Sequence, residues 1–271
     1  MDISFKTIIR DRKSVRSFDG RPLAAEDKQK LESYIAKLEN PFGIPIQFQF
    51  LNTKDHGVSS PVIVGTGEYL AAKVVKAEHF EIAFGYTFEK ACLYAASLGI
   101  GTVMLAASLS RKAFEEAMQV GENEVLPVAS PIGYPAAKKS IRDSLMRKGL
   151  KADERRSFDS LYFSGSFDKP LTEGEAGVFA DALEFARWAP SAGNQQPWRA
   201  VVMENMVHFY EHQSMKESAL GDIQKVDVGI ALCHFDLVMQ EDGKPGQFVF
   251  CDPAIPAPEK TQYIVSYEVK A

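Results

Sequence analysis

Two long apolar segments, residues 80–98 and 226–243, most constrain what this chain can fold into. Each segment is hydrophobic nearly all round, which is typical of a helix buried between layers of a protein rather than lying on its surface. The second segment matches the first at a constant offset of 144 residues, which pairs Gly85 with Gly229. This register indicates two related halves that each supply one buried helix.

Shorter matches support the same duplication. The triplet at 17–19, Ser-Phe-Asp, returns at 166–168, and Pro41 falls on Pro190 at the same offset of 149 residues. The shared order of these matches favours an internal repeat. Two copies are too few for a solenoid, so a fused pseudo-dimer is the better interpretation. The alternative is chance similarity between two βα segments.

The hydrophobic patterns alternate between helical and strand periods along both halves, which predicts an α+β fold. We expect two half-domains, 1–160 and 161–271, interlocked as one structural unit. Helices are predicted at 25–38, 80–98, 110–118, 173–189 and 226–243. Strands are predicted at 46–51, 61–70, 102–105, 124–135, 198–203 and 207–210.

Composition excludes several classes of protein. With 271 residues, 45% of them hydrophobic, the chain can bury a sizeable core, and its net charge of -5 gives no electrostatic footprint for nucleic acid or an anionic membrane. We find neither a secretory signal nor an uninterrupted apolar run of roughly 18–20 residues, so we expect a cytoplasmic protein. The three cysteines are far apart and indicate neither disulfides nor a metal site.

A basic cluster near the amino terminus is the first candidate binding segment. In an extended chain the side chains of Arg12, Ser14 and Arg16 point the same way, with Lys13 between them. Two guanidinium groups flanking a hydroxyl suit a phosphate monoester, because charged bidentate donors and one neutral donor match its oxygens. The alternative is an exposed basic strand in solvent.

The second candidate is the loop A-P-S-A-G-N-Q-Q-P-W at 189–198, which follows a predicted helix. Small residues and prolines fix a tight backbone, while Ser191, Asn194 and Gln196 offer neutral donors and acceptors. Such a loop can bind the polar edge of a ligand without adding charge. The alternative is an ordinary helix-to-strand turn.

Taken together, these motifs resemble the flavin-dependent nitroreductase family. R-x-S-x-R-x-F near the amino terminus and A-P-S-x-x-N-x-Q-P-W after a helix carry the resemblance. LGIGTVMLAA at 98–107 is similar to the family's L-G-L-G-T segment, and a GYPA stretch ends at Ala136. RRSFDSLYF at 155–163 resembles the family's closing R-K-x-L-E-E segment. The resemblance covers most of residues 7–200.

The order of the motifs departs from the ordinary family, in which the A-P-S loop comes early. Here residues 40–45, NPFGIP, stand at the early position without the Asn and Gln of the motif, and the full loop lies in the second half. One half keeps the phosphate-binding segment and the other keeps the loop. The sequence therefore resembles the tandem, pseudo-dimeric branch of the family, with one intact flavin site per chain.

The resemblance implies FMN as the cofactor and assigns a role to each matching residue. Arg12, Lys13 and Ser14 would bind the phosphate, Arg16 would reach the pyrimidine end of the ring, and Arg155 would add charge at the phosphate. The remaining residues would contact the flavin ring: Pro190, Ser191, Asn194 and Gln196 from the loop, and Met104, Leu105, Ala106 and Ala107 along one side. No side chain need act as acid or base, because the flavin carries the chemistry.

The activity implied by the resemblance is that of an FMN-dependent oxidoreductase with a nitroreductase-like fold. NAD(P)H would reduce the flavin and leave, and an electron-poor nitroaromatic or quinone would then take the electrons in a ping-pong reaction. Two alternatives stay open: a flavin-binding carrier or sensor without turnover, and a family offshoot acting on halogenated or enoate substrates. The chain would act as a monomer or a homodimer.

Overall fold

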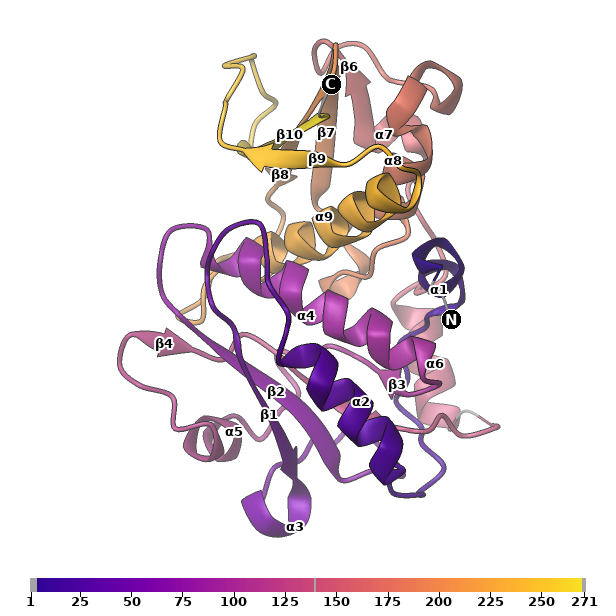
Figure 1. The fold of residues 1–271 in the computed structure, drawn as a ribbon, viewed down its shortest axis with the longest axis vertical. Helices are drawn as coiled ribbons and strands as arrows, with labels where there is room; N and C mark the ends of the chain where they lie inside the picture. Colours follow the sequence, from indigo (N-terminus) through magenta and orange to yellow (C-terminus); the bar gives the residue numbers. More distant parts are fainter. Residues whose placement is uncertain (1–3, 139, 270–271) are drawn as a thin grey trace. The chain divides into compact units, whose positions relative to one another are not determined.

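The computed structural model describes residues 4–138 and 140–269, and it shows the α+β fold expected from the sequence (Figure 1). Internal contacts divide the chain into two compact units. Unit 1 comprises Met1–Arg10, Glu81–Tyr86 and Asp153–Ala271, and unit 2 comprises Asp11–Phe80 and Thr87–Ala152. The division into half-domains 1–160 and 161–271 remains a prediction.

The elements follow one another in a similar order in the two units. Unit 2 contains α2 (Ala25–Ile35), β1 (Gln47–Asn52), α3 (Thr53–His56), β2 (Glu68–Val75), β3 (Gly101–Thr102), α5 (Arg111–Ala117), β4 (Glu124–Val125), β5 (Ala129–Gly133) and α6 (Ile141–Gly149). Most of unit 1 is α1 (Phe5–Asp11), α7 (Phe158–Leu161), β6 (Tyr162–Ser164), α8 (Ala180–Arg187), β7 (Trp198–Met203), β8 (Met206–His212), α9 (Ile223–Glu241), β9 (Gly246–Val249) and β10 (Thr261–Val269). Helix α4 (Phe80–Ser97) contributes residues to both units.

The two sheets share one strand order. In unit 2 the order is β1-β2-β5-β3, with β4 beside β2, and every pairing is antiparallel. In unit 1 the order is β6-β7-β8-β10-β9, and only the added edge strand β6 runs parallel to its neighbour. Strands β7-β8-β10-β9 thus repeat the arrangement of β1-β2-β5-β3, which supports the internal repeat.

Alternating side chains on the strands build the core of unit 2. Leu51 of β1 pairs with Tyr69 of β2, and both belong to a buried cluster with Phe114 of α5. On the opposite face Phe48 contacts Phe88 of α4, with ring centroids 5.6 Å apart. Strand period two therefore gives this sheet two buried faces, each covered by a helix.

Helix α9 forms the core of unit 1, as its uniform hydrophobicity predicts. Its Phe235 makes edge contacts with Phe209 of β8 and Tyr267 of β10, at centroid distances of 5.1 and 5.0 Å. Helix α8 packs beside it, and Phe179 contacts Phe235 at 6.3 Å. A buried helix of this kind draws most of its stability from packing rather than from intrinsic propensity.

The helix register inferred from the sequence reappears in the structure. Helix α4 ends at Ser97 and α9 ends at Glu241, which keeps the offset of 144 residues. The first turns of α4 and α9 cross in close backbone contact within unit 1. A Cβ atom added at Gly85 would lie 2.0 Å from the carbonyl oxygen of Val226, and one at Gly229 would lie 2.2 Å from that of Ile82. Because Ile82 and Val226 are themselves 144 apart, the crossing is nearly symmetric.

Several predicted boundaries were wrong for local reasons. The strand expected at 61–70 begins only at Glu68, because Gly65 adopts a left-handed φ of 86° and the chain turns there. The helix expected at 173–189 is an α-helix only over Ala180–Arg187, since Gly177 has a φ of 55° and two 3₁₀ turns precede it. The strand expected at 102–105 ends at Thr102. Helices α1 and α6 and strand β10 were not predicted.

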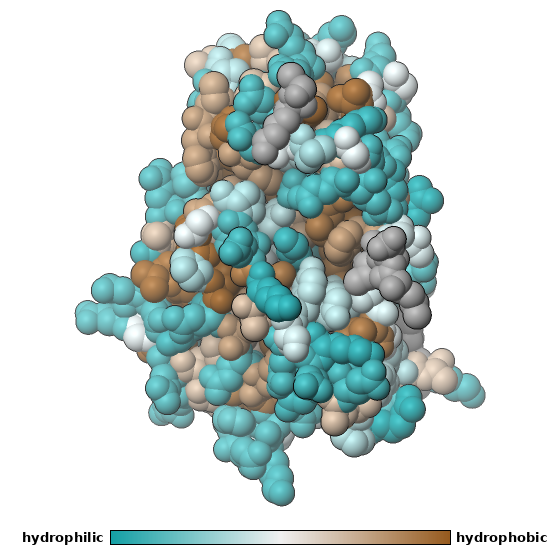
Figure 2. Space-filling view, in the orientation of Figure 1, coloured by the Kyte–Doolittle hydropathy of each residue, from teal (hydrophilic) through white to brown (hydrophobic). Residues whose placement is uncertain are grey.

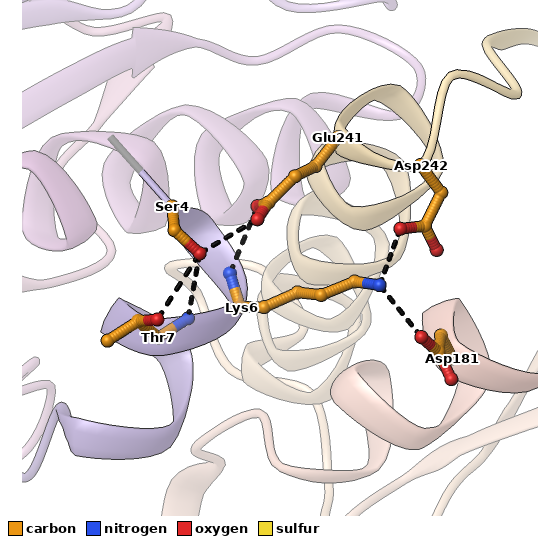
Figure 3. A network of polar contacts seen from close by, with 6 residues as sticks. All are labelled: Ser4, Lys6, Thr7, Asp181, Glu241 and Asp242. Atoms are coloured by element: carbon orange, nitrogen blue, oxygen red, sulfur yellow. Dashed lines mark hydrogen bonds and ion pairs between the residues drawn. The ribbon is translucent and has the colours of Figure 1, made fainter. Parts of the chain in front are cut away.

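Helix α1 is fixed within unit 1 by a network of charges (Figure 3). The Lys6 ammonium donates to Asp181 at 2.7 Å and to Asp242 at 2.5 Å, and Ser4 Oγ donates to Glu241 at 2.8 Å. These acids lie at the start of α8 and the end of α9. The network thus anchors the segment that directly precedes the basic cluster.

Figure 2 shows hydrophilic and hydrophobic residues intermixed on the visible face. The large hydrophobic side chains that are exposed come from scattered places in the described chain: Val64, Val75, Leu145, Leu150, Val178, Met215 and Phe250. Single exposed apolar residues are normal on protein surfaces. Within residues 4–138 and 140–269, every helix is too short or too polar to cross a membrane.

Candidate functional site

The basic cluster lies in unit 2 and is extended, as predicted. It follows the end of α1, and the Val15 amide donates to the Thr102 carbonyl at 2.9 Å, so the segment runs beside β3. Arg16 is only 9% exposed and Arg12 is half-buried, whereas Lys13 is exposed. The alternative of a basic strand standing free in solvent is therefore wrong for the two arginines.

The guanidinium groups of this cluster retain unused donors. Arg12 Nε lies 3.6 Å from Glu89 and Arg16 Nη1 lies 3.7 Å from Asp143, distances too long for hydrogen bonds. Among the described residues, Arg12 Nε, Arg16 Nε and Arg16 Nη1 are buried without a hydrogen-bond partner. Burial lowers the pKa of Arg16, and the positive charge of Arg147 lowers it further. Buried donors of this kind are unusual unless a ligand completes them.

The turn at Met104–Ala107 lies in the same unit, after β3. Leu105 exchanges backbone hydrogen bonds with Ala129, at 2.8 and 3.1 Å. Arg111, which sequence reasoning missed, donates to the carbonyl oxygens of Ala106, at 2.6 Å, and Leu126. In the described part of the chain the amides of Ala106 and Ala107 donate to no group. Arg111 therefore fixes a turn whose outer N–H groups stay available.

The A-P-S loop lies in unit 1, between α8 and β7, and its backbone is strained. Gly193, Asn194 and Gln196 have φ values of 58°, 55° and 52°, which place two non-glycine residues in the left-handed region. Ser191 Oγ accepts the Gln196 amide at 2.9 Å and closes the loop on itself. Strain at non-glycine positions clusters at functional sites and persists only where surrounding contacts impose it.

Further contacts tie this loop to the segment at 154–156. Gln196 Oε1 accepts the Arg156 amide at 2.9 Å, and Asn194 Nδ2 donates to the Glu154 carbonyl at 3.1 Å. Pro190 and Ser191 remain partly exposed. The side chains of Asn194 and Gln196 thus bond to the protein itself, which fixes their orientation.

Arg155 lies beside the loop in unit 1. Its guanidinium donates to the Trp188 carbonyl at 3.2 Å and lies 5.5 Å from the centroid of the Trp188 ring. The RRSFDSLYF motif therefore places its first arginine next to the A-P-S loop.

Asp227 of α9 also contacts the loop and was missed by sequence reasoning. Its two carboxylate oxygens lie 3.1 and 3.0 Å from the Ala192 amide. An acid near the start of a largely apolar helix was the signal that could have identified it.

The structure therefore brings the predicted residues together in two groups. Unit 2 joins the cation segment to the turn after β3, and unit 1 joins the A-P-S loop to Arg155. The first group supplies cationic and amide donors, and the second supplies neutral amide and hydroxyl groups together with the Arg155 guanidinium. The first group suits an anion, and the second suits the polar edge of an uncharged ring.

Comparison with solved structures identifies the class of fold. A "putative nitroreductase" from Thermotoga maritima is similar over 99% of this chain and 94% of its own, with a TM-score of 0.64 and 18% sequence identity. A nitroreductase family protein from Clostridium novyi is 17% identical over 52% of this chain and 91% of its own, with a TM-score of 0.43. An FMN-dependent nitroreductase from Clostridium difficile is 15% identical over 52% and 94%, with a TM-score of 0.41. No curated protein sequence matches significantly.

The fold is thus nitroreductase-like, and the full-length likeness to the Thermotoga protein fits the tandem arrangement. The family model described as "Putative TM nitroreductase" matches residues 4–239. The chain belongs to this family, which makes it a nitroreductase-like oxidoreductase.

Proposed function

We propose that this protein is an FMN-dependent oxidoreductase that uses NAD(P)H to reduce electron-poor acceptors such as nitroaromatics or quinones. The observation that carries the proposal is that Arg12 Nε, Arg16 Nε and Arg16 Nη1 are buried without hydrogen-bond partners within the described residues. A phosphate monoester would complete them with charge-assisted hydrogen bonds. Family membership supports the same cofactor class.

The residues of the chain would divide the work of binding. Arg12, Lys13 and Ser14 would bind the phosphate, with Arg155 adding charge there. Arg16 would place a positive charge where negative charge develops during reduction, which favours electron uptake. Pro190, Ser191, Asn194 and Gln196 would bind and orient the ring from unit 1, with Met104, Leu105, Ala106 and Ala107 from unit 2.

When bound, FMN would supply the two-electron chemistry that couples oxidation of NAD(P)H to reduction of the acceptor. Ala106 and Ala107 contribute amide N–H groups without side chains that could ionise, so the turn would orient its ligand by neutral donors. A cytoplasmic location, a ping-pong order and a pseudo-dimeric monomer or homodimer belong to the same proposal.

The first test is the visible absorbance spectrum of the purified protein, recorded before and after anaerobic addition of NADPH or NADH. We expect a flavin spectrum near one equivalent per chain that bleaches with either nucleotide and recovers with a quinone. A bound flavin that does not bleach would favour a carrier or sensor instead. No flavin uptake from added FMN would refute the proposal.

A matched pair of variants tests the site assignment. Arg12→Met with Arg16→Met keeps the apolar stems but removes both guanidinium groups, and we expect the FMN dissociation constant to rise at least about 100-fold. Arg21→Ala is the control, because Arg21 is exposed and pairs with Asp19 in the same stretch of chain. Circular dichroism checks that each variant is folded. Unchanged FMN affinity in the folded double variant would rule out this phosphate site.

A further inference from the structure

Asp227 is a buried acid with an unusually poor set of partners. It is 3% exposed, and both of its carboxylate oxygens approach one donor, the Ala192 amide. Among the described residues, no other group donates to it and no lysine or arginine forms an ion pair with it. A carboxyl group with one neutral donor recovers little of the hydration that it loses on burial.

The charges around Asp227 are of its own sign. Asp222 caps the start of α9 by accepting the Gln224 amide at 2.9 Å, and Glu211 of β8 accepts from Gln262 at 2.6 Å. Both acids are fully buried and both oppose ionisation of Asp227. Burial, followed by these two negative charges, raises the pKa of Asp227 well above its ordinary value. The fold therefore gains little from Asp227 and bears the cost of burying it.

A second acid on the same helix shows how a structural carboxylate is arranged. Asp236 is 7% exposed and accepts from three side chains: Tyr86 at 2.6 Å, Gln240 at 2.8 Å and Tyr267 at 3.2 Å. Tyr86 and Tyr267 link α9 to α4 and β10, whereas Gln240 lies on α9 itself. The contrast indicates that Asp227 has a purpose other than holding the helices together.

The Ala192 amide, the one donor to Asp227 among the described residues, belongs to the A-P-S loop. Ala192 begins the 3₁₀ turn that carries the left-handed residues Gly193 and Asn194. At the other end of the loop, Gln196 is bound to Arg156. Asp227 thus fixes the start of this turn, and it does so through the backbone amide of Ala192 rather than through a side chain.

We infer that Asp227 is a positioning residue that keeps the A-P-S loop in its ligand-binding conformation at the expense of fold stability. The inference rests on the proposed function, in which this loop contacts FMN. It goes beyond that function by assigning a role to a residue that would not itself touch the cofactor. It also predicts that removing the Asp227 carboxyl group weakens FMN binding without lowering the stability of the fold. Removing an acid with a merely structural role would lower the stability.

The experiment compares Asp227→Ala, Asp227→Asn and the control Asp236→Asn in the full chain. Asp227→Ala removes the acceptor, so we expect the FMN dissociation constant to rise at least tenfold while the thermal midpoint of the FMN-free protein stays equal or rises. Asp227→Asn keeps one acceptor oxygen and should bind FMN within threefold of the wild type. Asp236→Asn should lower the midpoint and leave FMN affinity unchanged.

Amide hydrogen exchange in the FMN-free protein gives a readout that does not need the cofactor. The Ala192 amide should exchange at least tenfold faster in Asp227→Ala than in the wild type, and Asp227→Asn should restore most of the protection. If wild-type protein binds no FMN, the proposed function fails, and this exchange measurement still decides whether Asp227 fixes the loop. Unchanged exchange, unchanged FMN affinity in Asp227→Ala, or parallel losses of affinity and stability would overturn the inference.

Discussion

The segment at 40–45 and the loop at 189–197 stand at matching places in the two repeats, yet they are stabilised in different ways. In the first, Asn40 satisfies its own turn: its Oδ1 accepts the Phe42 amide at 3.1 Å and its Nδ2 donates to Ile44 at 2.7 Å. In the second, Asn194 and Gln196 bond to residues 154–156, and Asp227 binds the Ala192 amide. The hydrogen bonds of Asn40 stay within its own turn, whereas those of Asn194 and Gln196 include bonds to residues 154–156.

The scaffolds around these segments have changed far less. Strands β1-β2-β5-β3 and β7-β8-β10-β9 have the same order, and α4 and α9 end 144 residues apart. Packing constrains a core strongly, because small changes in volume are felt throughout it. A surface segment is constrained only by what it binds. The repeat therefore conserves its buried elements while its two loops have become different.

The largest effect is expected where the two repeats are most alike. Gly85→Ala and Gly229→Ala each place a Cβ atom far inside van der Waals contact with a backbone carbonyl oxygen, at 2.0 and 2.2 Å. Backbone cannot move aside as a side chain can, so each variant should lose at least about 3 kcal/mol of unfolding free energy. Urea denaturation measures the loss.

The control for this pair is Gly174→Ala, because nothing lies within 4 Å of the added Cβ and the residue has no left-handed φ. It should change the unfolding free energy by less than about 0.5 kcal/mol. Equal losses in the two crossing variants would confirm the symmetry of the crossing. A loss confined to one of them would show that the close contacts at Gly85 and Gly229 contribute unequally to the unfolding free energy.

The next effect is a pH dependence of stability that we expect at one of two matching positions in the two sheets. Lys73 of β2 lies opposite Gln47, the first residue of β1, and pairs with Glu124 at 2.7 Å, whereas Glu211 lies opposite Trp198, the first residue of β7. Burial raises the pKa of Glu211 from 4.5 to about 7, and nearby Asp222 adds to the shift. Between these values the folded protein binds more protons than the unfolded chain, so stability should fall as pH rises from about 4.5 to about 7.

Thermal unfolding at several pH values checks this dependence. Asp222 raises the pKa of Glu211, whereas Gln262 and Lys225 lower it. Asp227, whose pKa is also raised, belongs to the same cluster of acids. Glu211→Gln should remove part of the slope and stabilise the protein near pH 7 by on the order of 1 kcal/mol. Lys73→Gln is the matched control and should leave the slope unchanged. If stability fell just as steeply with pH in Glu211→Gln, the neighbouring acids and not Glu211 would be the groups that titrate.

A smaller effect compares the two turns directly. Asn40→Ala removes two local hydrogen bonds, so it should lower the unfolding free energy by about 1 kcal/mol and leave FMN affinity within twofold. Gln196→Ala should weaken FMN binding, since Gln196 keeps its left-handed backbone through the bond to Arg156. Fluorescence titration with FMN and urea denaturation measure both quantities. Equal effects of the two variants on FMN affinity would contradict the proposed loss of one site.

Much of the scaffold was readable from sequence because its signals are local. The uniform hydrophobicity of 226–243 and the alternation at 46–51 correctly predicted α9 and β1. The strand at 124–135 was divided instead into β4 and β5, since Pro127 lies between them and cannot donate to a ladder. Helix α6 was missed because its nine residues are mostly charged or polar and show no broad apolar face.

The candidate site was predictable in its motifs but not in its supporting contacts. The spacing of Arg12, Ser14 and Arg16 predicts a shared orientation, and the structure confirms an extended, partly buried segment. Nothing in the sequence shows that Asp227 meets Ala192, because the two residues are 35 positions apart and meet only through the fold. Contacts of this kind depend on tertiary packing, which a local pattern does not encode.

The smallest effect concerns α1 and the ion pairs that Lys6 forms with Asp181 and Asp242. Burial alone lowers the pKa of Lys6, but hydrogen bonds to Asp181 and Asp242 raise it above the ordinary 10.5. Its contribution to stability is therefore complete below about pH 10.5 and is lost as pH rises through the raised pKa. Lys6→Met should lower the unfolding free energy by about 0.5–1 kcal/mol, less at high salt. Lys30→Met, which breaks the exposed pair with Glu26, should lower the unfolding free energy by less than Lys6→Met does. Equal losses in the two variants would show that α1 is anchored by its apolar contacts alone, and the basic cluster would then begin from a helix that charge does not fix.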